Sequence, residues 1–581
     1  MEALPDGLDE RSFEECLKYW AIKTNQTHRA INMLLAIMRK KVSSVSLPRS
    51  AKSLLKTSRK ATSKIVEIGE TKYWYNGIKN SLLHVLRSRP SLYLVKLNIN
   101  IDGMKVFNAS TINFWSVLIN IHGHPAINPM PVAIFSAEKK PACLITFLTP
   151  LVEELKDLIT NGLLTNEHIV DVSVRAFICD SPARAFIKGV MNFNAKHGCL
   201  KCEAEGFFEA NTTVFPTVEG VRRTDAKFRQ GEYIDHCKFA TPLLEIPNFD
   251  IVEDVIVADR LHLIDLGIMK RLLSGWKDGT LGFNAKLTAQ QVNEVSEKLK
   301  QIILPSEIHR KQRSLLSLAY WKGSELSSFL HYSSLVSLEE HVSKDVFQHF
   351  LLLFCSVTLF SSEYYKKYWS TAKSMLEEFV RQYEHVYGRR YITSNVHNLL
   401  HVSHEVDRFG PLSSLTAYPF ENQLGNLKRL IRHGYNILEQ AVNRLSEIEE
   451  AGYEHKLHQH YPMMKMCANR KQLFIDDNFI LDCTRKDSFF LTKSNQIVKI
   501  CDIKQIQGSH FEIFGNEYVS KSNRFTQPIV SSVINIYVVE KNSLSNVTSQ
   551  FNIEAIKCKL AALDYKNASY VMIPIIHTLR E

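Results

Sequence analysis

The stretch around residue 180 constrains the fold most, because a strand pattern there leads directly into an acid, a helix and a cysteine pair. Apolar side chains alternate with others through residues 172–178, which is typical of a strand. Asp180 follows at the carboxyl end of that strand, where α/β sheets commonly hold their reactive groups. A helix is expected from Ser181, and the pair Cys199-x-x-Cys202 comes soon after it. This order predicts an α/β domain with a functional site at the end of the strand.

Composition places the chain among globular proteins and limits its surroundings. Its 581 residues are enough for roughly three or four domains, and 45% of them are hydrophobic. Residues 1–9 are polar and acidic, so no secretory signal is expected, and no apolar run reaches the about 20 residues of a membrane span. The 11 cysteines are odd in number and mostly isolated in apolar contexts, which indicates reduced thiols in the cytosol or nucleus.

The net charge of +11 gives a weak indication of a polyanionic partner. A soluble basic protein without such a partner agrees with this charge equally well. Residues 41–68 concentrate Ser, Lys and Arg and predict a basic linker that could touch phosphates.

Residues 8–40 have the spacing of helices, interrupted like a turn at residues 24–27. The pattern fits a small helix-turn-helix, or a helical prefix that packs on the next domain. We favour the prefix.

The pattern changes to strands from residue 92. Residues 92–103 predict a strand that ends in the tight-turn pair Asp102-Gly103, and residues 105–107 and 114–121 predict the next two strands of a meander. A short apolar run at 132–135 and a helix over 146–161 precede the strand that ends at Asp180. Three meander strands, a helix and a strand with an acid at its tip outline a ribonuclease-H-like fold. Such a fold would make Asp102 and Asp180 neighbours in the sheet.

The rest of the chain divides into helical and β-rich parts. Residues 260–395 have mostly helical spacing, and short β-type runs begin at about residue 469. The predicted fold class is therefore α/β: a ribonuclease-H-like catalytic domain interrupted by an all-α insertion, with an N-terminal helical segment and a small β-rich C-terminal domain. The predicted division is 1–68, 69–259 with the cysteine pair, 260–390 as the insertion, 391–460 with the final acid, and 469–581.

A third acid is expected on a helix near the end of the catalytic domain. Glu421 fits, because Pro419 favours a helix start and places Glu421 in the first turn. Lys428 and Arg432 follow on the same predicted helix face and form a basic stripe suited to a DNA backbone, although an ordinary solvated face explains them equally well. Three carboxylates could hold two Mg²⁺ or Mn²⁺ ions for phosphodiester chemistry. The competing acids are Asp171, Glu405 and Asp407.

A zinc site is a second candidate. Cys199 and Cys202 offer two thiolates from one turn, and His397 and His401, four residues apart, face the same way on a helix. Together they complete a Cys₂His₂ set that would bind Zn²⁺ and join the strand region to the Glu421 helix. Alternative ligands are His236, Cys237, His262 and His404.

These pieces in this order resemble the DDE transposases of the CACTA-like cut-and-paste superfamily, and the zinc motif is distantly similar to that of the V(D)J recombinase core. The resemblance covers about residues 15–450. The matching pieces are Asn100-Ile101-Asp102-Gly103, Cys179-Asp180-Ser181-Pro182-Ala183-Arg184-Ala185, Gly198-Cys199-x-x-Cys202, Asp259-x-x-His262-x-x-x-x-Gly267, His397-x-x-x-His401 and Pro419-Phe420-Glu421.

The resemblance implies that Asp102, Asp180 and Glu421 are the catalytic triad and that Cys199, Cys202, His397 and His401 bind zinc. It also implies that residues 260–390 are an all-helical insertion. The N-terminal zinc-finger DNA-binding domain of many active transposases has no counterpart in this sequence.

The sequence thus predicts a Mg²⁺-dependent DNA transposase, or a protein derived from one. It would act in the nucleus on double-stranded DNA at transposon ends, as a homo-oligomer and without a membrane. The alternatives are a catalytically silent, domesticated DNA-binding protein on the same scaffold and a ribonuclease-H-like nuclease without strand transfer.

Overall fold

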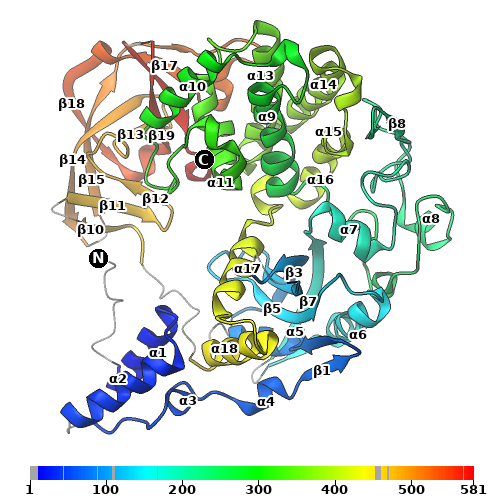
Figure 1. Cartoon of the computed structure of the whole chain (residues 1–581). Coiled ribbons are helices and arrows are strands. Elements are labelled where there is room, and N and C mark those ends of the chain that lie inside the picture. Colours follow the sequence, from blue (N-terminus) through cyan, green and yellow to red (C-terminus); the bar gives the residue numbers. More distant parts are fainter. Residues whose placement is uncertain are drawn as a thin grey trace.

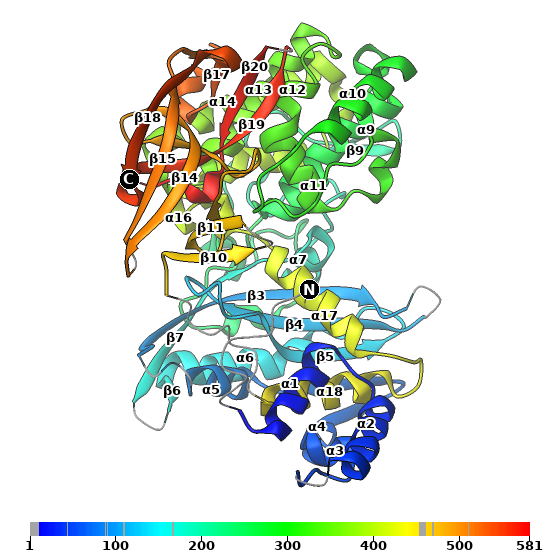
Figure 2. The same ribbon diagram turned by 90° about the vertical axis from the view of Figure 1, so that its left-hand side faces the viewer.

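The computed structural model describes residues 11–580 except 43–44, 88, 90, 108–110, 166–167, 452–459, 468–469, 509 and 567. A seven-stranded sheet occupies the lower half of Figures 1 and 2, and a helical region beside a second, eight-stranded sheet occupies the upper half. The prediction of a mixed α/β protein with a helical middle and a β-rich C-terminal part is therefore confirmed.

The first sheet has the strand order β1-β2-β5-β4-β3-β7-β6. Strand β7 runs parallel to β3, and the other pairs are antiparallel. The sheet begins at Ile65, slightly before the predicted domain start at 69. Its strands are β1 (Ile65–Ile68), β2 (Thr71–Tyr75), β3 (Leu94–Lys105), β4 (Asn113–Ile121), β5 (Met130–Ala137), β6 (Leu163–Leu164) and β7 (Ile169–Phe177).

Strands β3, β4 and β5 form a meander, but its members differ from the predicted ones: its third strand contains the short apolar run at 132–135. The pair Asp102-Gly103 lies inside β3, which continues to Lys105, so the expected separate strand at 105–107 is wrong. Gly103 pairs with Trp115 of β4, and a Cβ atom at Gly103 would come within 2.9 Å of the Trp115 ring. Glycine is needed there because an indole packs on the backbone, and no turn is formed.

Two hydrophobic cores lie on the two faces of this sheet. On one face, Val117 and Ile119 of β4 pack with the helices α5 (Ile78–Leu86) and α6 (Leu144–Asn161). On the other, Phe114 and Leu118 belong to the core of the helical region. The alternation along β4 is that of a strand buried on both faces. Figure 2 shows α5 and α6 on one side of the sheet and α17 on the other.

The N-terminal helices are α1 (Phe13–Lys23), α2 (His28–Lys41), α3 (Ala51–Leu54) and α4 (Arg59–Thr62). The break predicted at 24–27 is present, and Thr27 caps α2 by accepting a hydrogen bond from Ala30 N–H. Helices α1 and α4 pack against α18. This packing agrees with the interpretation as a helical prefix.

A segment with little regular structure precedes the helical middle of the chain. It contains β8 (Phe207–Glu209), β9 (Thr212–Val214) and α8 (Asp225–Arg229). A wide π-type helix, η2 (Arg260–Met269), opens the helical region. The α-helices that follow are α9 (Lys270–Asp278), α10 (Ala289–Gln301), α11 (Gly323–Ser328), α12 (Ser334–Ser337), α13 (Lys344–Phe360) and α14 (Trp369–Tyr387). The chain then returns to the first sheet through α15 (Ser394–Asn398), α16 (Val402–Phe409), α17 (Tyr418–Leu430) and α18 (Ile437–Ala451).

The C-terminal part forms a three-stranded and an eight-stranded sheet. The strands are β10 (Met463–Cys467), β11 (Arg470–Asp476), β12 (Phe479–Leu481), β13 (Phe489–Thr492), β14 (Ile497–Gln507), β15 (His510–Tyr518), β16 (Lys521–Asn523), β17 (Tyr537–Glu540), β18 (Leu544–Asn552), β19 (Ile556–Tyr565) and β20 (Ser569–Pro574).

A buried ion cluster joins this C-terminal part to the helical region. The Lys559 ammonium on β19 lies 2.8 Å from the Glu307 carboxylate and 2.7 Å from that of Asp487, and it donates to the Ile480 carbonyl. All three charged side chains are almost completely buried. Buried charges must be paired, so this cluster fixes how the two parts dock.

Replacing Lys559 by methionine should lower the free energy of unfolding by about 3–5 kcal/mol, because two carboxylates lose their buried counter-charge. The matched control is Lys557→Met on the same strand. Lys557 is half-buried, and its ammonium bonds the Asn495 amide oxygen and lies 5.7 Å from the centre of the Tyr364 ring, with no ion pair among the described residues. Chemical denaturation of both variants tests this. Equal small effects would show that the cluster adds nothing to docking.

Candidate functional site

Asp102 lies on β3, and Asp180 follows the end of the neighbouring parallel strand β7. The register pairs Ile99 with Phe177, and the Ile178 N–H donates to the Ile99 carbonyl at 2.8 Å. The charge of Asp180 contributes to the raised pKa of Asp102, so the two carboxyl groups lie near one another. Asp180 itself stands just beyond the strand, at the start of the next helix.

Asp180 also begins helix α7 (Ser181–Lys188). Its carboxylate accepts a hydrogen bond from Ala183 N–H at 2.8 Å, and Pro182 stands in the first turn. Further along this helix, the buried Arg184 donates to the carbonyls of Ile256 and Val257 at 3.0 and 3.3 Å. The helix that positions Asp180 is thus held against the next segment of the sheet.

Glu421 belongs to α17, which follows the helical region along the chain. It lies in the first turn of α17 after Pro419, as predicted. Burial and the negative charges of Asp180 and Glu421 raise the pKa of Asp102 to about 8, while the charge of His262 lowers it. Three acids from β3, the end of β7 and α17 therefore act electrostatically on one another.

These three acids do not gather as tightly as the cysteines and histidines described below. Among the described residues, Cys199, Cys202, His397 and His401 are the one set of three or more Cys, His, Asp or Glu side chains whose donor atoms could share a single metal ion.

His262, which the sequence offered as an alternative zinc ligand and as part of the Asp259-x-x-His262 motif, bridges two acids. Its Nδ1 contacts the Asp259 carboxylate through a short hydrogen bond, and its Nε2 lies 3.5 Å from the Glu421 carboxylate. Burial lowers the pKa of His262, but its bonds to Asp259 and Glu421 outweigh this and raise it to about 10. The imidazolium therefore carries a positive charge beside the three acids.

Asp259 fixes the position of the first turn of α17, which carries Glu421. It is completely buried and accepts hydrogen bonds from the N–H groups of Leu261 at 3.0 Å and Ala417 at 2.9 Å. One carboxylate thus caps η2 and holds the start of α17. The spacing Asp259-x-x-His262, an acid three residues before a histidine at a helix start, was the available signal for this link.

The four cysteine and histidine side chains meet in one buried cluster. Cys199 Sγ lies 3.6 Å from Cys202 Sγ and 3.3 Å from His401 Nε2, and Cys202 Sγ lies 3.3 Å from His397 Nε2. Two sulfurs bound to a tetrahedral zinc ion at about 2.3 Å would be about 3.8 Å apart. The cluster could bind a metal such as zinc.

The outer contacts of both histidines also suit a metal. His397 Nδ1 lies 3.0 Å from the Pro216 carbonyl and His401 Nδ1 lies 3.2 Å from the Glu219 carboxylate. These contacts engage Nδ1 and leave each Nε2 facing the thiols, the usual arrangement of zinc-binding histidines. Burial raises the pKa of the Cys199 thiol, but hydrogen bonding from Cys202 and the charge of His401 bring it well below its ordinary value.

The four alternative ligands lie outside this cluster. His236 is buried and bonds the His197 carbonyl, His404 contacts the Glu253 carboxylate, and His262 joins the acids. Cys237 is half-buried and pairs through its backbone with Val190.

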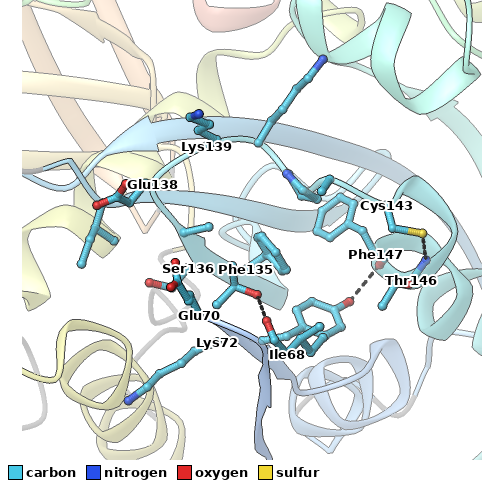
Figure 3. Close-up of a pocket in the computed structure, with 17 residues that line it drawn as sticks. Ile68, Glu70, Lys72, Phe135, Ser136, Glu138, Lys139, Cys143, Thr146 and Phe147 are labelled. Atoms are coloured by element: carbon cyan, nitrogen blue, oxygen red, sulfur yellow. Dashed lines mark hydrogen bonds between the residues drawn. The ribbon is translucent and has the colours of Figure 1, made fainter.

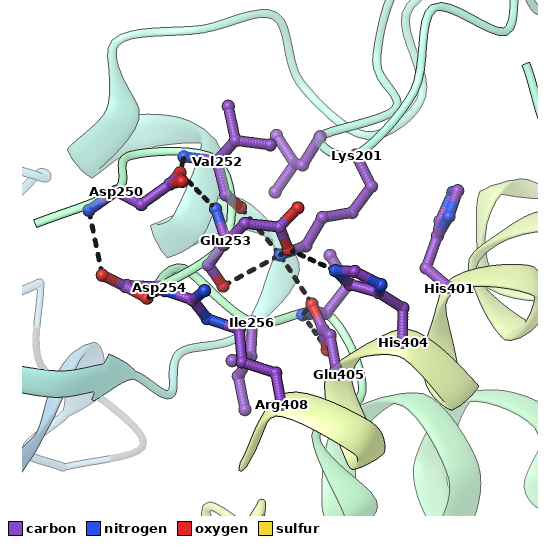
Figure 4. A network of polar contacts seen from close by, with 12 residues as sticks. Lys201, Asp250, Val252, Glu253, Asp254, Ile256, His401, His404, Glu405 and Arg408 are labelled. Carbon is purple, nitrogen blue, oxygen red and sulfur yellow. Dashed lines mark hydrogen bonds and ion pairs between the residues drawn. The ribbon is translucent and has the colours of Figure 1, made fainter. Parts of the chain in front are cut away.

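Lys201, between the two cysteines, links the cluster to the sheet (Figure 4). Its completely buried ammonium lies 2.7 Å from the equally buried Glu405 carboxylate and donates to the Val252 carbonyl at 2.7 Å. Glu405 in turn accepts from the N–H groups of Val257 at 2.9 Å and Ala258 at 2.6 Å. Glu405, a competing acid in the sequence, therefore has a structural role.

The basic stripe beyond Glu421 differs from the prediction. Lys428 is exposed in the last turn of α17, but the helix ends at Leu430, so Arg432 does not continue its face. The Arg432 guanidinium instead donates to the backbone carbonyl of Asn25 and, at 3.0 Å, to its side-chain oxygen. The helix ends early because Ile431 has extended backbone angles.

A hollow of about 620 Å³ lies beside β2, β5 and the start of α6. Figure 3 shows the side chains that line it. None of the predicted site residues lines it. Cys143, at its rim, caps α6 and accepts from Thr146 N–H, which lowers the pKa of this thiol.

Comparisons with known proteins assign part of the chain only. Residues 457–575 match a family model described as a domain of unknown function, DUF8592. A search of curated proteins finds no match. Of the helices that the structure describes, none combines the length and the apolar character needed to cross a bilayer.

Purified protein should contain a single zinc ion per chain, and Cys199→Ala should lose it and unfold at lower temperature, because three ligands cannot close a structural site. Metal analysis and thermal melting measure both effects. Cys237→Ser serves as the control and should keep its zinc. Wild-type protein without metal would contradict the assignment.

Proposed function

We propose that this chain is a DDE-type DNA transposase, or a protein derived from one, that cleaves DNA strands and joins them to a target. One observation carries the proposal: Asp102, Asp180 and Glu421 come from three distant parts of the sequence to one edge of the sheet, where their charges interact. The resemblance to the CACTA-like superfamily in the order of these motifs adds support.

The strand arrangement supports a ribonuclease-H-like fold for this part. The order β5-β4-β3-β7, with three antiparallel strands followed by a parallel one, agrees with that fold. A further short parallel bridge joins Phe177 to Val255 beyond β7. The helical residues between η2 and α16 then form an insertion before the final acid.

The acids supply what phosphoryl transfer requires. Carboxylate oxygens are the ligands that Mg²⁺ and Mn²⁺ prefer, and a pair of such ions bound here would activate a water or a 3′-hydroxyl and stabilise the leaving oxygen. The raised pKa of Asp102 means that this carboxyl holds a proton near neutral pH until a cation takes its place.

His262 positions Glu421 in this scheme. Its imidazolium, held by Asp259, attracts the Glu421 carboxylate and keeps it turned toward the sheet edge. The same positive charge reduces the mutual repulsion of the three acids. His262 thus acts through Glu421 as a positioning residue.

The Cys₂His₂ cluster has a structural role in this proposal. Zinc bound there would join the turn at residues 199–202 to the segment 397–401 that leads toward α17. We further propose that the protein acts in the nucleus on double-stranded DNA at transposon ends, as a homo-oligomer.

A catalytically silent DNA-binding protein on the same scaffold is the second candidate. The observation that favours it is that the three acids, unlike the Cys/His cluster, are not drawn close enough to share one ion among the described residues.

Asp180→Asn, Asp102→Asn and Glu421→Gln should each lower Mg²⁺-dependent strand cleavage and joining by at least about 100-fold, since each removes a charged oxygen ligand of the cation pair. The assay uses the DNA that flanks the coding region. Asp171→Asn is the matched control, because Asp171 is an exposed acid on β7 and should retain activity. Cleavage without joining would indicate a nuclease, and wild-type inactivity with intact DNA binding would indicate the silent protein.

The stability of the metal-free protein should fall as pH rises from about 5 to 9. Folded Asp102 keeps its proton up to about pH 8, while the unfolded chain loses it near the ordinary aspartate pKa of about 4, so folding takes up a proton in this window. Thermal melting in EDTA measures the slope.

Asp102→Asn should flatten that slope, and Asp171→Asn should leave it unchanged. Mg²⁺ should restore the stability of the wild type at high pH, because it binds the ionised carboxyl. A wild-type slope equal to that of Asp102→Asn would contradict the raised pKa.

A further inference from the structure

A cavity of about 730 Å³ separates two parts of the chain that are far apart in sequence. One wall comes from the start of α2 and the segment 52–62, and the other from the end of α17 and from α18. Lys52, Arg432, His433 and Arg444 line it together with several serine and threonine hydroxyls. Both the ammonium and the guanidinium groups are donors without acceptor capacity, so the lining favours an anion.

The nearest acid has its charge already compensated. The Glu447 side chain is buried, and it accepts from His28 at 2.9 Å, from Arg444 at 2.7 Å and from the Thr57 hydroxyl. Among the described residues no hydrogen bond or ion pair engages the exposed Lys52 ammonium. Lys52 and Arg432 therefore give the cavity an excess of positive charge.

Helix α17 connects this cavity to the acids. Glu421 stands in its first turn and Leu430, its last residue, lines the cavity. Nine residues of helix span about 14 Å, which corresponds to about four base pairs at a rise of 3.4 Å. Lys428 and Arg429 are exposed and lie in the last turn of α17, directly before Leu430.

We propose that this cavity binds backbone phosphates of DNA a few nucleotides from the phosphodiester that reacts at the acids. The proposal rests on the proposed function and extends it, because it gives the N-terminal helical prefix a part in holding the substrate. Contacts to phosphate carry no direct sequence information, so binding at this cavity should not depend on base sequence. The basic segment 41–68 then takes part in binding through its residues 52–62.

The decisive test is the salt dependence of DNA binding by Lys52→Glu. Binding of a duplex of about 30 base pairs is measured in the Asp180→Asn background, so that cleavage does not interfere. Lys52→Glu should weaken binding about tenfold at low salt, and Lys52→Ala should reduce the slope of log affinity against log salt by about 0.9, the value for one phosphate contact. Lys52 is exposed, so both variants should fold.

The matched control is Lys300→Glu on α10, an exposed lysine of the helical region that pairs with Glu297. It changes the net charge equally and should leave affinity and slope almost unchanged. Equal effects of Lys52→Glu and Lys300→Glu would overturn the proposal, because only the overall charge would then matter.

Hydrogen exchange supplies a second measurement on the intact chain. Duplex DNA should protect the backbone amides of residues 50–62 in the Asp180→Asn protein and not in its Lys52→Glu variant. Protection by inorganic phosphate but not by DNA would overturn the proposal in favour of a small-anion site. If the Asp180→Asn protein binds no duplex at all, the proposed function itself fails; if it binds with an unchanged slope in Lys52→Ala, only the cavity assignment fails.

Discussion

The buried pair of Lys201 and Glu405 is the interaction on which the arrangement of both candidate sites depends. Lys201 stands between the two cysteines, and Glu405 lies four residues after His401, so the pair ties together the two halves of the Cys₂His₂ cluster. Glu405 also holds the backbone of Val257 and Ala258, directly before Asp259. An unpaired buried charge is costly, and this cost makes the joint specific.

Asp259, the next residue along the chain, connects this buried pair to the acids. Asp259 caps the π-type helix, holds the start of α17 and orients His262, whose charge faces Glu421. Such wide helices are often found at functional sites. The Cys/His cluster and Glu421 are thus joined through Lys201, Glu405, residues 257–259 and His262, although the two sites share no ligand.

The C-terminal part depends on a different constraint. Lys559 pairs with Glu307 and Asp487 across its junction with the helical region, and the buried Arg524 adds a second link, to the half-exposed Glu339. The described part of residues 457–575, which match the domain of unknown function, is thus docked on the helical region and does not form a detached unit.

Periodicity and short spacings are local properties, and they were enough to predict the strand before Asp180, the helix that carries Glu421, the helical middle and the four members of the Cys₂His₂ cluster. That Gly103 continues a strand could be seen only in the folded chain, since the reason is the Trp115 ring of the next strand. The same holds for three side-chain contacts: Glu405 pairs with Lys201, His262 contacts Glu421, and Arg432 donates to Asn25. These roles depend on partners many residues away, and nothing in the local pattern specifies which long-range neighbour a charged side chain will meet.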